Sequence, residues 1–282
     1  MSQERHWKHH GRVIRAQISS SAAPERLWQA WTDPQKISHW FTDKATGDPR
    51  VGAAYTWEFE GYSTGGPLEV LEAVPNQSLV LAGFDPAAQR DLPGVEPSIT
   101  EIRIEHHGGQ TVVTLVNSGF DDREEFRDEV EGVESGWPLV LARLQLYAEN
   151  YFDEPRRSFD VLRPAEYSYE GLLPYFRETA GLSRWLTTSG SVDRPGDPCE
   201  LAFRDGGKLT GRVLTVTKRE VSVSWSEVRG ALEFSAFKMH GQPQHVLGLR
   251  VIGWGLEASR AAEIRKEITP AVERLAAAFT RF

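Results

Sequence analysis

The chain has 282 residues, more than the about 100 to 150 of a common domain, so two domains are the first expectation. A hydrophobic fraction of 40% and a charged fraction of 26% are typical of a folded globular protein, and a net charge of -8 argues against a general nucleic-acid binder, which needs a clustered basic face. The single cysteine, Cys199, excludes an internal disulfide framework and any cysteine-rich zinc site.

The residue pattern of the first half predicts a strand, two helices, a run of strands and a long helix. Val13 to Ser20 alternates apolar and polar residues, as a strand with one solvated face does. A helix follows with Pro24 in its first turn, and Pro34 ends it and begins a short second helix that reaches Phe41. After a turn-rich stretch, strand patterns cover 55–60, 67–74, 78–84, 98–106 and 111–118. The long helix has an apolar stripe of Trp137, Val140, Leu141, Leu144, Tyr147, Ala148 and Tyr151.

The second half predicts the same order of elements. Strand patterns cover 158–165, 199–203, 208–217, 221–228, 232–239 and 245–253. The last helix has a stripe of Ile264, Ile268, Val272, Leu275, Phe279 and Phe282. Arg156 and Arg157, which follow Pro155, mark the expected linker between the halves.

The two halves also share sequence. LWQAWTDPQKISHWFT at 27–42 aligns without a gap with LLPYFRETAGLSRWLT at 172–187, and Trp40 recurs as Trp185. Further along, Glu69-Val70-Leu71 resembles Arg212-Val213-Leu214. A repeat this long indicates domain duplication rather than a stacked array.

Antiparallel strands segregated from helices define an α+β class. A single helix covers a sheet of six or so strands only if the sheet curls around it, which leaves room for an internal space. We therefore expect two tandem domains, 1–153 and 154–282. Each is a curved antiparallel sheet around a long C-terminal helix, with two short helices after the first strand.

Specific motifs in the first half resemble a known family. They are Ala23-Pro24-Glu25-Arg26 through Trp31-Thr32-Asp33-Pro34 to Trp40-Phe41, then Arg50-Val51-Gly52, Val70-Leu71-Glu72, Ser118-Gly119-Phe120 and Gly136-Trp137. This half is similar to the proteins named after the activator of the 90-kDa heat-shock protein ATPase, within the START-like, helix-grip (SRPBCC) superfamily. The second half departs from the pattern at Thr179-Ala180-Gly181, where the family has Asp-Pro. The resemblance implies a cavity for hydrophobic ligands.

A ligand pocket is our candidate site. Tyr55, Trp57 and Phe59 alternate with polar residues, which places three large rings on one sheet face. We predict that they bind a small apolar or aromatic ligand together with Phe84, Trp137, Leu141 and Leu144; plain core packing of the same residues is the alternative. Trp225, Phe234 and Trp254 have similar positions in the second half. The first copy keeps more of the family pattern, so we expect it to hold the better pocket.

Other polar residues have simpler interpretations. Glu58 and Glu60 lie on the face opposite the rings, so they are poor candidates for acid or base catalysis. Glu101 and Arg103 share one face of their strand, and we expect them to be exposed and to contact a neighbouring strand rather than to form a buried catalytic pair. His6, His9 and His10 have metal-ligand spacing only if their segment is helical, so we predict no metal site. His106, His107, His240 and His245 lie next to turns, where they could act as an acid or base at a pocket mouth.

Three functions from different classes remain open. The first is binding or transport of a small hydrophobic or aromatic ligand. The second is a polyketide cyclase or aromatase-like enzyme, and the third is a co-chaperone or stress-response role that uses the acidic segment 121–134 or the seam between domains. No nucleotide-binding or hydrolase motif appears, and we predict no cofactor. No apolar run reaches the roughly 18 residues of a membrane span and the start lacks a signal peptide's apolar core, so we expect a cytoplasmic protein, with a homodimer as one assembly.

Overall fold

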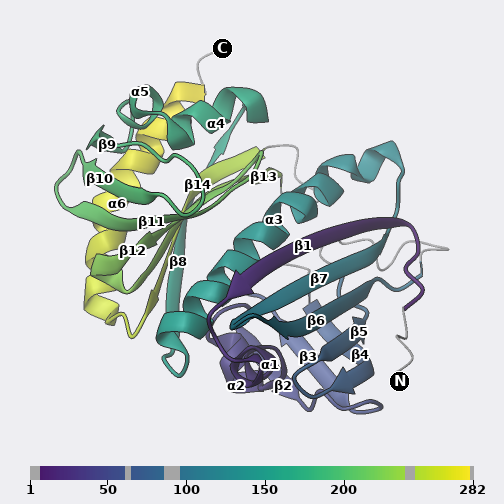
Figure 1. Cartoon of the computed structure of the whole chain (residues 1–282). Helices are drawn as coiled ribbons and strands as arrows, with labels where there is room; N and C mark the ends of the chain where they lie inside the picture. The colour runs from purple at the N-terminus through teal and green to yellow at the C-terminus, as the bar shows by residue number, and fades with distance from the viewer. Residues whose placement is uncertain (1–6, 61–64, 86–95, 239–244, 280–282) are drawn as a thin grey trace. The chain divides into compact units, whose positions relative to one another are not determined.

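The computed structural model describes residues 7–60, 65–85, 96–238 and 245–279. The chain forms two compact units, Met1–Glu134 and Ser135–Phe282, and each contains one seven-stranded antiparallel sheet (Figure 1). No described helix is long and apolar enough to cross a membrane.

The first repeat follows the order strand, two helices, six strands, long helix. Its elements are β1 (Arg12–Ser20), α1 (Pro24–Thr32), α2 (Pro34–Ser38), β2 (Lys44–Gly47), β3 (Ala54–Glu58), β4 (Gly65–Val74), β5 (Ser78–Ala82), β6 (Ile99–His107), β7 (Gln110–Phe120), the 3-10 turn η1 (Glu124–Phe126), α3 (Arg127–Leu146) and a π-helical turn, η2 (Tyr147–Tyr151). The strand order in the sheet is β1-β7-β6-β5-β4-β3-β2.

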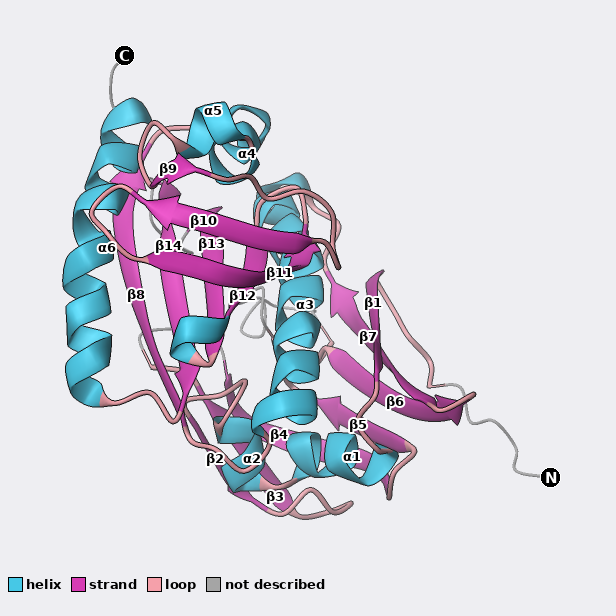
Figure 2. Ribbon diagram, turned by 60° about the vertical axis from the view of Figure 1, so that its left-hand side comes forward, coloured by secondary structure: helices cyan, strands magenta, loops and turns pink. Residues whose placement is uncertain are grey.

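The second repeat has the same order. Its elements are β8 (Arg156–Ala165), α4 (Tyr169–Arg177), α5 (Thr179–Leu182), β9 (Thr187–Ser189), β10 (Pro198–Phe203), β11 (Lys208–Val216), β12 (Val221–Trp225), the 3-10 turn η3 (Ser226–Val228), β13 (Gly230–Lys238), β14 (His245–Trp254) and α6 (Ala258–Phe279). The strand order is β8-β14-β13-β12-β11-β10-β9, and α6 packs along β8 and β14 (Figure 2).

Domain duplication is therefore confirmed element by element. The two sheets have the same order once each strand of the first is matched to its counterpart in the second. Even an irregularity recurs, because the register shifts between Val70 and Glu72 in β4 and between Val213 and Thr215 in β11. These are the segments that the sequence comparison had paired. The chain is a tandem helix-grip protein of the α+β class.

The repeated tryptophans explain why both helix pairs fold alike. The indole Nε1 of Trp40 donates to the carbonyl of Ala30 at 2.9 Å, and that of Trp185 donates to the carbonyl of Tyr175 at 2.9 Å. In each copy this bond spans ten residues and ties the second short helix to the first. Both indoles are fully buried, so each anchors the packing of its helix pair.

Two local expectations were wrong. The turn-rich stretch after Phe41 contains a short strand, β2, and its counterpart β9 was also missed, because strands of four and three residues have too few positions for a period-two pattern. Arg156 and Arg157 are not a linker: they begin β8. The compact units divide at 134/135, inside α3, whereas we had placed the domain boundary at 153/154; that boundary stays a prediction.

The second sheet is covered on both faces within its unit. One face contributes Val161, Phe234 and Leu249 to a hydrophobic core that includes Ile264, Ile268 and Val272 of α6. The other face meets the C-terminal part of α3 and η2: Tyr147 and Tyr151 stack on Trp254, with ring centroids 5.9 and 5.0 Å apart. Trp254 therefore lies on the face opposite Trp225 and Phe234, which contradicts the prediction that the three are similarly placed.

Candidate functional site

The rings that the sequence singled out belong to a larger aromatic cluster in the first unit. Trp57 lies at its centre, with ring centroids 5.1 Å from Phe84, 5.4 Å from Phe41 and 5.9 Å from Tyr55. Helices α1 and α2 and the residues after them supply the rest of the cluster, namely Trp31, Trp40 and Phe41. Phe59 packs on Phe41 and Phe84 at 5.2 and 6.0 Å and is half-buried, whereas the other rings are buried.

Two buried indole N–H groups in this cluster have no hydrogen-bond acceptor. They are the Nε1 atoms of Trp31 and Trp57, whose ring centroids are 6.1 Å apart. Tyr55 donates its hydroxyl to the carbonyl of Trp31 at 2.8 Å, and burial raises the pKa of that hydroxyl while the nearby Trp57 indole opposes the shift. A buried donor without an acceptor is uncommon and costs free energy, so it points to a missing partner such as water or a ligand.

Polar side chains share the sheet face with these rings. Thr100 and Asn117 are directly paired across β6 and β7, both are fully buried, and the Asn117 amide donates to the Thr100 hydroxyl at 3.0 Å. Register places them in one row with Val70 and Leu81, on the same sheet face as the neighbouring pair Tyr55 and Leu68. The face thus combines a large apolar area with a few orienting polar groups, as ligand-binding surfaces do.

The remaining predicted ligand residues lie on α3. Trp137, Leu141 and Leu144 are buried, but they belong to the second compact unit. The structure therefore brings Tyr55, Trp57, Phe59 and Phe84 together, and the participation of the three helix residues stays a prediction. Sequence reasoning missed Trp31 and Phe41 as members of the cluster, although their recurrence as Phe176 and Leu186 in the repeat was a usable signal.

Glu101 is buried, whereas the sequence predicts an exposed side chain. It is 2% exposed rather than solvated, because His9 covers it: His9 Nε2 lies 2.9 Å from its carboxylate, and Arg103 Nε donates to the same group at 2.6 Å. His9 Nδ1 lies 2.9 Å from the hydroxyl of Ser118. His9 therefore holds the segment before β1 on the sheet face opposite the aromatic cluster. His6 lies outside the described residues, and among those described no cluster could hold a metal ion.

The other histidines do not favour an acid or base beside the cluster. His106 Nδ1 lies 3.1 Å from the hydroxyl of Thr111 at the β6–β7 hairpin, and His245 packs on Tyr167 at 5.0 Å at the start of β14. His240 lies outside the described residues.

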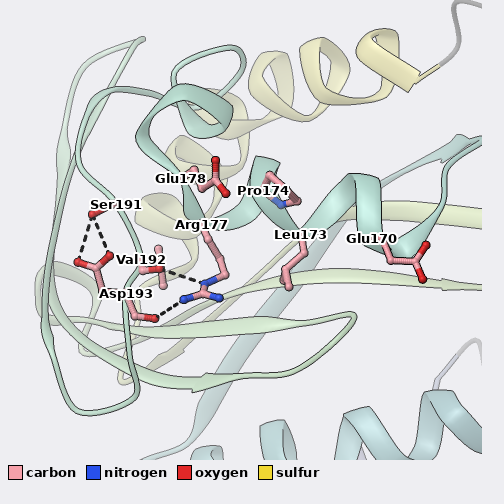
Figure 3. Close-up of a pocket in the computed structure, with 8 residues that line it drawn as sticks. All are labelled: Glu170, Leu173, Pro174, Arg177, Glu178, Ser191, Val192 and Asp193. Atoms are coloured by element: carbon pink, nitrogen blue, oxygen red, sulfur yellow. Dashed lines mark hydrogen bonds between the residues drawn. The ribbon is translucent and has the colours of Figure 1, made fainter.

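Two open grooves are found in the second unit. One, of about 290 Å3, lies beside α4, where Arg177 donates to the carbonyls of Val192 and Asp193 at 3.3 and 2.9 Å (Figure 3). Its guanidinium is thereby committed to holding the loop that forms the opposite wall. The other, of about 600 Å3, lies between η2 and strands β11 and β12, and is lined by Glu149, Asn150, Arg212, Ser224 and Trp225 among others. The expectation that the first copy holds the better pocket gains no support from these grooves.

The environment of Cys199 disfavours a reactive thiolate. It is buried in the second domain, and its Sγ lies 3.7 Å from the carbonyl of Ser191. Burial, with Asp193 and Glu200 adding to the effect, raises the pKa of its thiol to about 11. At neutral pH the group is a thiol, which disfavours covalent catalysis there.

Comparison with known proteins agrees with this architecture. Residues 21–149 match the family described as Activator of Hsp90 ATPase homolog 1-like protein. No curated protein matches the chain. Among solved structures, the Aha1 dimer from Colwellia psychrerythraea is 21% identical and covers 49% of this chain and 97% of its own, with a TM-score of 0.43.

Two solved structures extend over both repeats. The di-domain ARO/CYC BexL from the BE-7585A biosynthetic pathway is 11% identical over 96% of this chain and 99% of its own, with a TM-score of 0.43. DynU16, from the dynemicin biosynthetic locus, is 18% identical over 94% and 98%, with a TM-score of 0.40. At these values neither likeness informs function.

The fold defines the chain as a START-like protein with two helix-grip domains. Within the first of these domains, residues 21–149, from just after β1 into η2, are similar to the Activator of Hsp90 ATPase homolog 1-like family. A shared fold hosts many functions, so function must come from the site. The expected cytoplasmic location and the homodimer stay predictions.

Proposed function

We propose that the first domain binds a small, planar, apolar molecule that carries a hydrogen-bond acceptor. The observation that carries this proposal is the pair of buried, acceptor-free indole N–H groups of Trp31 and Trp57 inside a cluster of seven aromatic rings. Stacked and edge-on rings provide apolar surface for a planar ligand, and an oxygen placed between the indoles would satisfy donors that the protein leaves unpaired.

The entry point in this proposal is Phe59. It is half-buried at the edge of the cluster, so a ligand that slides between Phe59 and Phe84 contacts Trp57 without unfolding the sheet. The buried pair Thr100–Asn117 offers a second polar group on the same sheet face for orientation.

Ligand binding is tested by native mass spectrometry of the purified chain and by thermal shift with flavonoids, polyketides, fatty acids and sterols. We expect flavonoids or aromatic polyketides to raise the melting temperature in a concentration-dependent way, as mass action requires of a ligand that binds only the folded state. A protein that is empty and ignores every compound would contradict the proposal, and partner pull-downs would then test the co-chaperone alternative.

A matched pair of variants locates the site. Phe59→Leu removes the edge ring and should weaken binding roughly fivefold, since an aromatic contact contributes about 1 kcal/mol. Phe203→Leu is the control, because Phe203 is a half-buried ring at the end of β10 that packs on Trp225 at 5.4 Å in the second domain. Equal losses of affinity in both variants would show that the ligand does not bind at the cluster.

A further inference from the structure

The face of the second sheet that does not contact α6 carries a row of polar and charged side chains. Ser222, Glu233, Arg250 and Asp160 are consecutive partners across β12, β13, β14 and β8. Their neighbours along the strands, such as Leu232 and Leu249, point into the core instead. Alternation along each strand therefore puts opposite charges side by side on the outer face.

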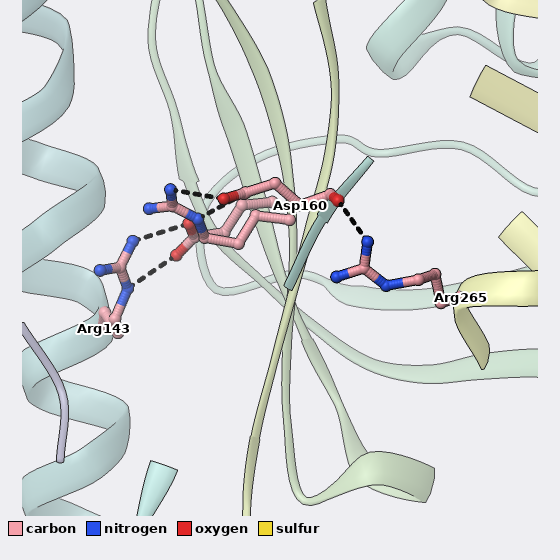
Figure 4. A network of polar contacts seen from close by, with 5 residues as sticks. Arg143, Asp160 and Arg265 are labelled. Atoms are coloured by element: carbon pink, nitrogen blue, oxygen red, sulfur yellow. Dashed lines mark hydrogen bonds and ion pairs between the residues drawn. The ribbon is translucent and has the colours of Figure 1, made fainter. Parts of the chain in front are cut away.

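Helix α3 contributes an arginine to this row. Arg143 donates from Nε and a terminal nitrogen to the two carboxylate oxygens of Glu233, at 3.0 and 2.7 Å, and the two side chains are 3% and 0% exposed. Arg250 makes the same bidentate contact with Asp160: its Nε and a terminal nitrogen donate to the two carboxylate oxygens at 2.7 and 3.1 Å. Figure 4 shows Arg143 reaching the sheet from α3 while Arg265 reaches the backbone of Asp160 from the opposite side. The C-terminal part of α3 is thus fixed to the sheet through a desolvated ion pair.

A third carboxylate faces the same junction with one oxygen that accepts no hydrogen bond. Glu220 lies in the turn before β12, and its Oε2 atom is buried and makes no hydrogen bond. This oxygen points at Gly136 of α3, where a side-chain carbon would lie 3.9 Å away. The arginines nearby are engaged elsewhere: Arg143 with Glu233, Arg250 with Asp160, and Arg219 over the ring of Tyr169 at 3.9 Å.

This environment favours the protonated form of Glu220. Burial, followed by the charge of Glu233, raises the pKa of its carboxyl to about 7, against the opposing effect of Arg250, Arg143 and Arg219. A carboxylate that is released to water returns to its ordinary value of 4.5. Between these two values the docked helix holds a proton that an undocked helix would lose.

We propose that Glu220 is a proton-binding latch that fixes the C-terminal part of α3 on the outer face of the second sheet. Closing the latch takes up one proton at Glu220 between pH 4.5 and 7, so the docked state is most favoured below pH 4.5. Stability of the docked state falls as the pH rises from 4.5 to 7 and changes no further above 7, because the group is then ionised in both states. Since α3 is the closing helix of the first repeat, the latch makes its attachment to the second domain depend on pH.

The test is hydrogen exchange of the full-length protein at pH 5.5 and pH 8, expressed as protection factors that correct for the intrinsic pH dependence of exchange. In the unmodified protein we expect the protection of amides 139–146 to be about thirtyfold lower at pH 8 than at pH 5.5. In Glu220→Gln, which keeps the shape and cannot ionise, protection should be equal at both pH values. Glu200→Gln, an exposed carboxylate on β10, should behave as the unmodified protein does.

A direct titration supports or overturns the same inference even if a variant folds poorly. The side-chain carboxyl carbon of Glu220, followed by NMR in the unmodified protein, should titrate with a midpoint near 7. A midpoint near 4.5, or a Glu220→Gln protein that keeps the full pH dependence, would overturn the latch. Neither result depends on ligand binding by the first domain, so this proposal and the proposed function fail separately.

Discussion

Arg143 shows how one buried side chain can fix the position of a helix, here α3, on a sheet. It lies in the last turn of α3, between the buried residues Ala142 and Leu144, and makes a desolvated, bidentate ion pair with Glu233. Such a pair contributes little net stability compared with apolar residues of the same size, but removing one partner leaves an uncompensated charge. The pair is therefore important for the position of α3 rather than for the total stability of the chain.

The single variant Arg143→Met should accordingly destabilise the protein by about 3 to 5 kcal/mol, because Glu233 remains buried without its partner. The double variant Arg143→Met with Glu233→Met should recover most of that loss. Urea unfolding at pH 7 measures both. Arg260→Met is the control, since Arg260 pairs with Glu263 on the exposed side of α6 and its removal should cost less than about 1 kcal/mol. A double variant as unstable as the single one would contradict this account.

At the scale of elements, the second short helix of each repeat, α2 and α5, differs in how it begins. Asp33 caps α2, because its side chain accepts hydrogen bonds from the backbone N–H groups of Gln35 and Lys36 at 2.8 and 3.2 Å. Glu178 occupies the same position before α5 and makes no side-chain cap. The departure of the second copy from the Asp-Pro pattern thus has a structural consequence: its short helix starts without a cap.

Asp33→Ala should therefore cost about 1 kcal/mol of stability, the usual contribution of a helix N-cap. Glu178→Ala should change stability by no more than a few tenths of that amount. Thermal unfolding of the two variants in parallel checks the difference. Equal effects would mean that the cap is dispensable and that Trp40 and Trp185 alone position the helix pairs.

At the scale of the whole molecule, the compact units do not coincide with the sequence repeats. Residues 135–153 belong to the first repeat by sequence, yet Arg143, Tyr147 and Tyr151 contact the second sheet. A fragment that begins at 154 loses these contacts, which uncovers Trp254 and leaves Glu233 without its ion-pair partner.

We expect the fragment 135–282 to melt at a higher temperature than the fragment 154–282, by roughly 10 °C if the lost contacts are worth about 2 to 3 kcal/mol. Circular dichroism on both fragments measures this. Equal melting temperatures would instead support a domain boundary at 153/154, where the sequence places it.

The sequence alone determined the features that depend on local pattern. The period of two in the strands, the helical stripes and the Trp40–Trp185 repeat were enough for the α+β class and for the duplication, because each follows from residues close together in the chain. Only the tertiary structure decided which residues share a surface. Trp31 joined the rings of β3, Glu101 became buried beneath His9, and Trp254 faced α3 instead of its own core. These outcomes depend on contacts between segments as many as 100 or so residues apart, and periodicity within one segment does not encode what will cover each face.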